Sequence, residues 1–298
     1  MNSQKLIDLL NSGTVLLCDG AMGTELQSRG LPAGGCPEAY NLTHPEIVQQ
    51  IHRDYFNAGA DLVETNSFGA NRFRLRAHDL QQRVAEINQL AAQLATSVCP
   101  DGKLVAGSVG PSGEILQPYG ERNPEELADA FSEQILALAK GGADVIFVET
   151  MMAMEEAELA VRVSKEKTHL PVVASMTFEK GKAGLRTAWG VDVPTAVQRL
   201  SEAGADLIGA NCGKGFDEML AIVEEMRPLT SKPVIAQSNA GLPEWVDGVS
   251  VYKETPESIK PYAEQLLKLG VNILGGCCGT GPAHIQMMRE LVDGFLGK

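Results

Sequence analysis

Eight short apolar segments recur along the chain and constrain its fold more than any other feature. Each is rich in Val, Ile and Leu and is bounded by Gly, Asp or Pro; they cover residues 15–20, 60–66, 103–110, 143–150, 171–178, 205–212, 233–239 and 271–278. Their apolar residues run almost continuously, which is typical of parallel strands buried on both faces. Segments with helical spacing follow most of them, at residues 45–59, 83–98, 124–142, 155–167, 193–204, 217–227 and 256–270. Alternating strands and helices predict a parallel α/β fold.

An internal repeat supports closure of this sheet into a barrel. NAGADLVETN, KGGADVIFVET, EAGADLIGANC and KLGVNILGGCC share one pattern and contain the second, fourth, sixth and eighth apolar segments. Eight strands with every second unit alike predict a (β/α)8 TIM barrel, which we assign as a single domain over residues 1–298. An open, doubly wound sheet is the alternative, but no G-x-G-x-x-G motif follows the first strand, so dinucleotide binding has no support.

Composition narrows the class of partner and the compartment. The formal net charge of −13 argues against nucleic acid and anionic membranes as partners. The sequence has no secretory leader pattern and no apolar run long enough to cross a membrane. Its six cysteines lack the regular spacing of a disulfide framework. We therefore expect a cytoplasmic protein, in which clustered cysteines are metal ligands or nucleophiles.

Three of these cysteines lie at the ends of predicted strands. Cys212 ends the sixth strand, and Cys277 and Cys278 end the eighth. The carboxyl ends of barrel strands meet at one mouth, so three thiolates there can occupy three corners of a tetrahedron and leave one open, as in catalytic zinc sites. Adjacent residues on a strand point to opposite faces, but glycines at 275, 276, 279 and 281 let the backbone bend. A pair of small buried side chains or a vicinal disulfide is the alternative for Cys277 and Cys278.

Thiolate ligands favour zinc over harder cations, and the absence of a fourth cysteine with ferredoxin spacing argues against an iron–sulfur cluster. A zinc ion with three thiolates activates water poorly, but it can bind and deprotonate a thiol substrate for alkylation. Asp19 and Glu149, at the ends of strands one and four, are candidates for binding an ammonium group, although a turn cap and an ion pair are the alternatives. The backbone N–H groups of Gly107 and Ser108 are candidates for binding a carboxylate.

Five stretches resemble the homocysteine S-methyltransferase family: CDGAMGTELQ (18–27), ETNSFGAN (64–71), VAGSVGP (105–111), GANCG (209–213) and GGCCGTGPAHI (275–285). The resemblance is closest to the homocysteine-binding module of cobalamin-dependent methionine synthase. It implies a zinc-dependent barrel that activates homocysteine as a zinc-bound thiolate and methylates it to methionine. It implies these roles: Cys212, Cys277 and Cys278 as zinc ligands, Asn239 as an exchangeable fourth ligand, and Asp19, Glu149, Ser108, Gly107 and Asn66 as substrate-binding residues.

The methyl donor is less constrained. The stretch SNAGLPEWVDGVSVYKETPE (238–257) resembles the methionine-synthase branch, whose members carry cobalamin and folate domains. The sequence ends at Lys298, soon after the eighth strand, so we expect methylcobalamin on a separate corrinoid protein. Betaine and S-methylmethionine, the donors in sister branches, are the alternatives. A non-catalytic thiolate metal-binding barrel is a further alternative. A metal-free aldolase would need a lysine inside the barrel, which the apolar segments lack beyond Lys103.

Overall fold

The computed structural model describes residues 3–246 and 249–297 and shows a parallel barrel. All eight predicted strands form: β1 (Leu16–Leu17), β2 (Leu62–Glu64), β3 (Leu104–Val109), β4 (Val145–Met151), β5 (Val172–Met176), β8 (Leu207–Cys212), β9 (Val234–Ser238) and β12 (Ile273–Gly276). They pair in the order β1-β12-β9-β8-β5-β4-β3-β2, and every pairing in this sheet is parallel. A parallel bridge between Cys18 and Leu62 joins the first strand to the second. The predicted (β/α)8 barrel is therefore confirmed.

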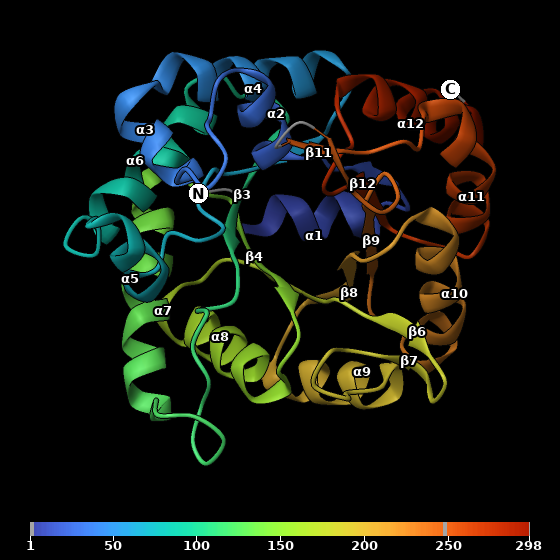
Figure 1. The fold of residues 1–298 in the computed structure, drawn as a ribbon. Coiled ribbons are helices and arrows are strands. Elements are labelled where there is room, and N and C mark those ends of the chain that lie inside the picture. The colour runs from blue at the N-terminus through green and yellow to red at the C-terminus, as the bar shows by residue number, and fades with distance from the viewer. Residues whose placement is uncertain (1–2, 247–248, 298) are drawn as a thin grey trace.

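Helices form an outer ring around the strands (Figure 1). The seven predicted helices lie where the apolar spacing placed them: α4 (Pro45–Asn57), α6 (Val84–Thr96), α7 (Pro124–Gly141), α8 (Met154–Lys167), α9 (Val193–Ala203), α10 (Phe216–Met226) and α11 (Pro256–Lys268). The ring ends with α12 (Pro282–Phe295). Helix α7 shows how the sequence sets such boundaries: Asn123 and Glu126 form a capping box at its start, and Gly142 ends it with a φ of 103°. None of the helices in the described residues is long and apolar enough to span a membrane.

The long segments after the strands carry additional elements. The one after β1 contains α2 (Met22–Ser28) and α3 (Tyr40–Thr43), and the one after β2 contains α5 (Arg72–Leu75). Two antiparallel hairpins extend from the same end of the barrel: β6 (Glu179–Gly181) with β7 (Gly184–Arg186), and β10 (Glu244–Val246) with β11 (Val249–Val251). These segments surround the mouth at the carboxyl ends of the strands, where barrel enzymes place their sites.

A helix that the sequence analysis did not predict closes the opposite end. Helix α1 (Ser3–Asn11) lies across the centre of the ring in Figure 1. Its Leu6 and Leu10 are buried in the same cluster as the inward-facing strand residues. The ammonium group of Lys5 donates to the carbonyl of Lys103 at the start of β3. The helix therefore seals the floor of the barrel and leaves the mouth as the open end.

The inward-facing side chains change from apolar to polar on going from floor to mouth. Large apolar groups fill the lower part, with Leu62, Leu104, Phe147, Leu207 and Ile235 as examples. Two or four residues further along the strands, the inward positions near the mouth are mostly polar; they are Glu64, Ser108, Glu149, Ser175, Asn211 and Gln237. Because strand side chains alternate between faces, this step in polarity places a hydrogen-bonded layer directly above the apolar core.

The repeated motif forms a repeated clamp at the floor. In each repeat an Asp or Asn lies just before the strand that the repeat contains. Its side-chain oxygen accepts a hydrogen bond from a backbone N–H at the start of the preceding barrel strand. The four pairs are Asp61 with Leu17, Asp144 with Val105, Asp206 with Val172 and Asn272 with Val234, at 2.7–2.9 Å. The backbone N–H of each clamp residue donates back to the carbonyl of its partner. Each clamp thus fixes the register of two neighbouring strands where the regular ladder begins.

Replacing a clamp residue should weaken the fold. We expect Asn272→Ala to lower the free energy of unfolding by about 1–2 kcal/mol, because the N–H of Val234 loses its acceptor. Asn272→Asp is the matched control, since an Asp occupies this place in the other three repeats and keeps the acceptor oxygen. Urea unfolding followed by circular dichroism measures both variants. Equal destabilisation by Ala and Asp would show that the side-chain bond is not what matters.

Candidate metal and substrate site

The three cysteines predicted as ligands converge at the mouth. The sulfur atoms of Cys212, Cys277 and Cys278 all lie within 4.8 Å of one another. In a tetrahedral site with zinc–sulfur bonds of about 2.3 Å, neighbouring sulfurs are about 3.8 Å apart. The three thiols therefore fit one zinc ion, and they come from β8 and from the turn after β12. These two strands are separated by β9 in the sheet.

A departure from regular strand geometry turns the sulfur of Cys212 toward the other two. The neighbouring Asn211 faces into the barrel, so regular alternation would send Cys212 toward the helices. Instead Cys212 has a φ of 67° and Gly213 a φ of 78°, so the chain turns sharply at the end of β8. A non-glycine residue with a left-handed backbone is strained by about 1–3 kcal/mol and is usual at functional sites.

The glycines around the Cys277–Cys278 pair have different roles from the expected one. Gly275 and Gly276 belong to the regular strand β12, and neither has a positive φ. Gly279, in the turn after the strand, has a φ of 81°. A Cβ on Gly276 would clash with the side chain of Thr280, and one on Gly275 would press against Cys18. These two glycines are therefore needed for close packing, and the bend occurs in the turn that follows the strand.

Hydrogen bonds among the thiols favour the thiolate form of one of them. Hydrogen bonds from Cys277 and Cys278 lower the pKa of Cys212 to about 3, whereas the same contact raises the pKa of Cys277 well above its usual value. The amide Nδ2 of Asn239 lies 3.5 Å from the sulfur of Cys212. The hydroxyl of Tyr252, from the segment after β11, forms a hydrogen bond with Cys278. The cluster is thus already arranged to stabilise thiolate.

Three carboxyl groups lie beside the sulfurs in the polar layer. Glu64 accepts a hydrogen bond from the amide of Gln237 at 2.9 Å, and the backbone N–H of Glu64 donates to Asp19. Glu149 accepts from the hydroxyl of Ser108 at 2.5 Å. Burial is the main cause that raises the pKa of all three acids, to about 8 for Asp19, and their mutual repulsion adds to the effect for Glu64 and Asp19. A cationic group entering here would relieve this repulsion.

Asn211 connects the sulfur cluster to this acidic group. Its Nδ2 donates to Glu149 at 2.9 Å and to the hydroxyl of Thr150 at 2.7 Å. Its Oδ1 accepts from the backbone N–H of Thr150 and from the hydroxyl of Ser175. Thr150 has a φ of 56°, which is unusual for a β-branched residue. The side chain of Asn211 therefore holds Glu149 and the strained Thr150 while its backbone continues directly into Cys212.

A cavity of about 360 Å³ opens above these groups. Of the residues predicted from the sequence, Cys212, Cys277, Cys278, Glu149, Ser108 and Asn66 line it. Asp19, Gly107 and Asn239 do not. Asp19 is buried and accepts a hydrogen bond from the backbone N–H of Glu64, and the Cα of Gly107 faces Leu138 of α7.

The polar groups of Ser108 and Asn66 are engaged within the protein. The backbone N–H of Ser108 donates to the hydroxyl of Thr65 at 3.0 Å. The amide of Asn66 donates to the carbonyl of Pro37 and to Asn41, which joins the long segment after β1 to the tip of β2. Both residues form part of the cavity wall, and their roles toward a substrate stay predictions.

Sequence reasoning did not assign roles to Glu64, Asn211, Gln237 and Tyr252. The first three occupy the last inward-facing position of their strands, so the two-residue period together with the strand tips would have identified them. No such pattern exists for Tyr252, because it belongs to an irregular segment whose path over Cys278 depends on tertiary packing.

Comparison with known proteins agrees with this geometry. Residues 16–292 match the homocysteine S-methyltransferase family. The chain is 36% identical to methionine synthase of Mycobacterium tuberculosis and 35% identical to that of Mycobacterium leprae, over 96% and 93% of its length. It spans only about a quarter of these relatives, 25% and 24% respectively.

Solved structures show the same fold. The metallated form of the homocysteine methyltransferase MmuM from Escherichia coli superimposes with a TM-score of 0.81 at 24% identity, covering 96% of this chain and 99% of the other. A methyltransferase from Methanosarcina mazei gives a TM-score of 0.64 at 12% identity, covering 99% of this chain and 98% of the other. The family match extends over nearly the whole barrel and includes every strand that contributes to the mouth. The chain belongs to the homocysteine S-methyltransferase family, as its sequence motifs predicted.

Proposed function

We propose that residues 1–298 act as one homocysteine-binding barrel, which transfers a methyl group to the sulfur of homocysteine and so forms methionine. The observation that carries this proposal is the convergence of three sulfur atoms within 4.8 Å at the mouth of a barrel of this family. A zinc ion held by Cys212, Cys277 and Cys278 would supply the Lewis acidity that lowers the pKa of a substrate thiol. Asn239, beside Cys212, is the candidate for an exchangeable fourth ligand.

The acidic group explains why an amino-acid thiol fits this mouth. Glu64 and Glu149 line the cavity, and the carboxylate of Asp19 accepts a hydrogen bond from the backbone N–H of Glu64. An α-ammonium group placed among them would form charge-assisted hydrogen bonds and offset the cost of burying several carboxylates together. In homocysteine the ammonium nitrogen and the thiol sulfur are separated by one carbon–nitrogen bond, two carbon–carbon bonds and one carbon–sulfur bond. It can therefore reach the carboxylates and the sulfur cluster together.

A methyl-corrinoid protein is the donor that we propose, in preference to betaine or S-methylmethionine. Support comes from the relatives named methionine synthase, which match this chain over more than nine-tenths of its length. Nucleophilic attack by the substrate sulfur on the methyl carbon forms the new carbon–sulfur bond, and the bonding pair of the breaking cobalt–carbon bond stays on cobalt. We also propose a cytoplasmic location, because a reducing compartment keeps these thiols available for a metal.

Removing one sulfur should abolish metal binding and activity together. We expect Cys278→Ala to lose bound zinc and to reduce methionine formation by more than the ~10–100-fold that loss of an outer-shell partner costs. Cys99→Ala is the control, because Cys99 lies at the end of α6 and outside the cluster. Metal content by atomic emission and methionine by mass spectrometry provide the two readouts. Full activity of metal-free Cys278→Ala would contradict the proposed zinc chemistry.

The identity of the donor can be tested directly. We expect the zinc-loaded protein with homocysteine to form methionine from methylcobalamin, and at most trace amounts from betaine or S-methylmethionine. Each donor is supplied separately, and methionine is quantified over time against a reaction without protein. Turnover with betaine alone would assign the chain to a different donor class, while leaving the thiol-activating site in place.

Asn211 should control the affinity for homocysteine through Glu149. We expect Asn211→Ala to raise the homocysteine Kd about 10–100-fold, because Glu149 loses a charge-assisted hydrogen bond and its fixed position. The zinc content should stay at the level of the unchanged protein. Ser175→Ala is the control, since it removes a bond to Asn211 and leaves the Asn211–Glu149 bond intact. Isothermal titration measures both, and an unaltered Kd in Asn211→Ala would disprove this positioning role.

A further inference from the structure

The segment that follows β11 lies against the sulfur cluster. We call residues 252–254 the strap; they have no regular secondary structure and begin with Tyr252. The ring of Tyr252 packs on Gly279 so closely that a Cβ on this glycine would clash with it. The hydroxyl of Tyr252 forms a hydrogen bond with Cys278. The strap therefore contacts the turn that contains two of the three cysteines, and it does so through both a ring and a polar group.

Glu254 fixes the strap to three segments around the cysteines. Its carboxylate accepts a hydrogen bond from the backbone N–H of Phe216, at the start of the helix that follows β8. Its backbone N–H donates to the carbonyl of Ala240 at 3.2 Å, and the N–H of Ala240 donates to the carbonyl of Cys278 at 2.9 Å. Its own carbonyl accepts from Nε2 of His284 at 2.8 Å. The strap is thus joined to the segments that follow β8, β9 and β12.

His284 links the strap to the cysteine turn with both of its ring nitrogens. Its Nδ1 accepts from the backbone N–H of Gly281 at 3.2 Å, so this nitrogen has no proton. The other nitrogen, Nε2, carries the proton that is donated to the carbonyl of Glu254. One side chain therefore holds the strap at a fixed position relative to the turn that contains Cys277 and Cys278.

A cysteine that ligates a metal needs a hydrogen-bond donor beside it. Such a cysteine is a thiolate without a proton, so Tyr252 must donate in its bond with Cys278. Three thiolates around a divalent ion leave a net negative charge, and Glu149 lines the same cavity. A donor to one sulfur disperses part of this charge. Partners of this kind also orient the ligand and raise the affinity for the metal.

We propose that Tyr252 is a positioning residue that holds the thiolate of Cys278 for the metal, and that His284 keeps Tyr252 in place through Glu254. The inference rests on the proposed function, because it requires a metal held by the three cysteines. Tyr252 does not line the mouth cavity, so it acts on the sulfur from outside the space left for the substrate.

Removing only the hydroxyl tests the hydrogen bond. We expect Tyr252→Phe to raise the zinc Kd ~10–100-fold in competition with a chromophoric chelator, because Cys278 loses its donor while the ring still packs on Gly279. With cobalt in place of zinc, the sulfur-to-cobalt charge-transfer band should move to longer wavelength, since a thiolate without a hydrogen bond gives up charge more easily. A purely structural role of the ring would leave this band unmoved.

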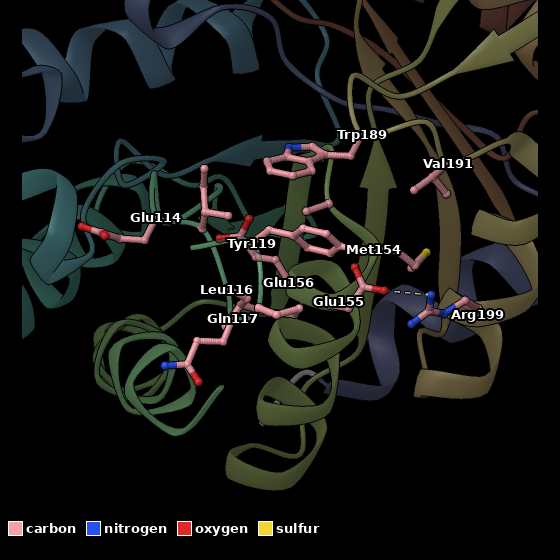
Figure 2. Close-up of a pocket in the computed structure, with 13 residues that line it drawn as sticks. Glu114, Leu116, Gln117, Tyr119, Met154, Glu155, Glu156, Trp189, Val191 and Arg199 are labelled. Atoms are coloured by element: carbon pink, nitrogen blue, oxygen red, sulfur yellow. Dashed lines mark hydrogen bonds and ion pairs between the residues drawn. The ribbon is translucent and has the colours of Figure 1, made fainter. Parts of the chain in front are cut away.

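Tyr119→Phe is the matched control for the loss of a hydroxyl. Tyr119 lines a separate cavity of about 480 Å³ together with Trp189 and Met154, and Figure 2 shows these three side chains there. None of the three lines the cavity above the sulfurs. We therefore expect the zinc Kd and the cobalt spectrum of Tyr119→Phe to equal those of the unaltered protein.

His284→Asn tests the link between the turn and the strap. The Oδ1 of Asn is as many bonds from Cβ as the Nδ1 of His, so it can still accept from Gly281, whereas the bond to Glu254 is lost. We expect this variant to raise the zinc Kd about 2–10-fold, and to cause no further increase in protein that already contains Tyr252→Phe. Equal increases in the two backgrounds would show that His284 does not act through Tyr252.

The remaining outcomes separate this inference from the proposed function. An unchanged zinc Kd in Tyr252→Phe would overturn the inference, and methionine formation by the same protein would leave the proposed function in place. A raised Kd with an unmoved cobalt band would also contradict it, because packing would then explain the loss. Failure of the unaltered protein to bind zinc would remove the proposed function, together with the roles of Tyr252 and His284.

Discussion

The alternation of side chains along eight closed parallel strands determines what this protein can place at its mouth. Each strand sends every second residue inward, so the interior is built in layers whose composition the sequence sets independently. The lower layers are apolar and are sealed by α1, whereas the layer near the mouth contains Glu64, Ser108, Glu149, Asn211 and Gln237. The rigid apolar floor allows polar groups above it to keep fixed positions without support from solvent. The clamps at the floor set the strand register on which this layering depends.

The sulfur cluster requires a local exception to this alternation. Cys212 would face the helices on a regular strand, and it reaches the mouth only because its backbone is left-handed. Thr150, at the tip of β4, has the same unusual conformation. Both exceptions surround Asn211, whose four hydrogen bonds involve Glu149, Ser175 and Thr150. One buried amide therefore holds the strained backbone of Thr150, whose conformation costs about 1–3 kcal/mol, and it fixes Glu149 next to the residue that precedes Cys212.

The sequence predicted the regular part of this arrangement and less of the irregular part. Strands, helices and barrel closure followed from the hydrophobic period and from the internal repeat that contains every second strand. Strands buried on both faces consist almost entirely of apolar residues, which makes them easy to identify. The meeting of Cys212 with Cys277 and Cys278 followed from the common mouth of barrel strands. Helix α1 was not predicted, because it is a single short amphipathic stretch before the first strand and the internal repeat has no equivalent segment. The contact of Tyr252 with Cys278 depends on the path of an irregular segment, which local sequence does not determine.

The mouth places a cluster of cysteine sulfurs beside a group of carboxyl side chains, and negative charge on both would be mutually repulsive. Thiolates and carboxylates lie close together, and burial raises the pKa of Asp19, Glu64 and Glu149 above the usual value of a carboxyl group. In the proposed function, a zwitterionic thiol would compensate the carboxylates with its ammonium group while its sulfur binds the metal held by the three cysteines. A neutral thiol of equal length would gain no charge-assisted hydrogen bonds with these carboxyl groups. In the proposed function, selection for an amino-acid thiol follows from the carboxyl groups that lie beside the sulfurs.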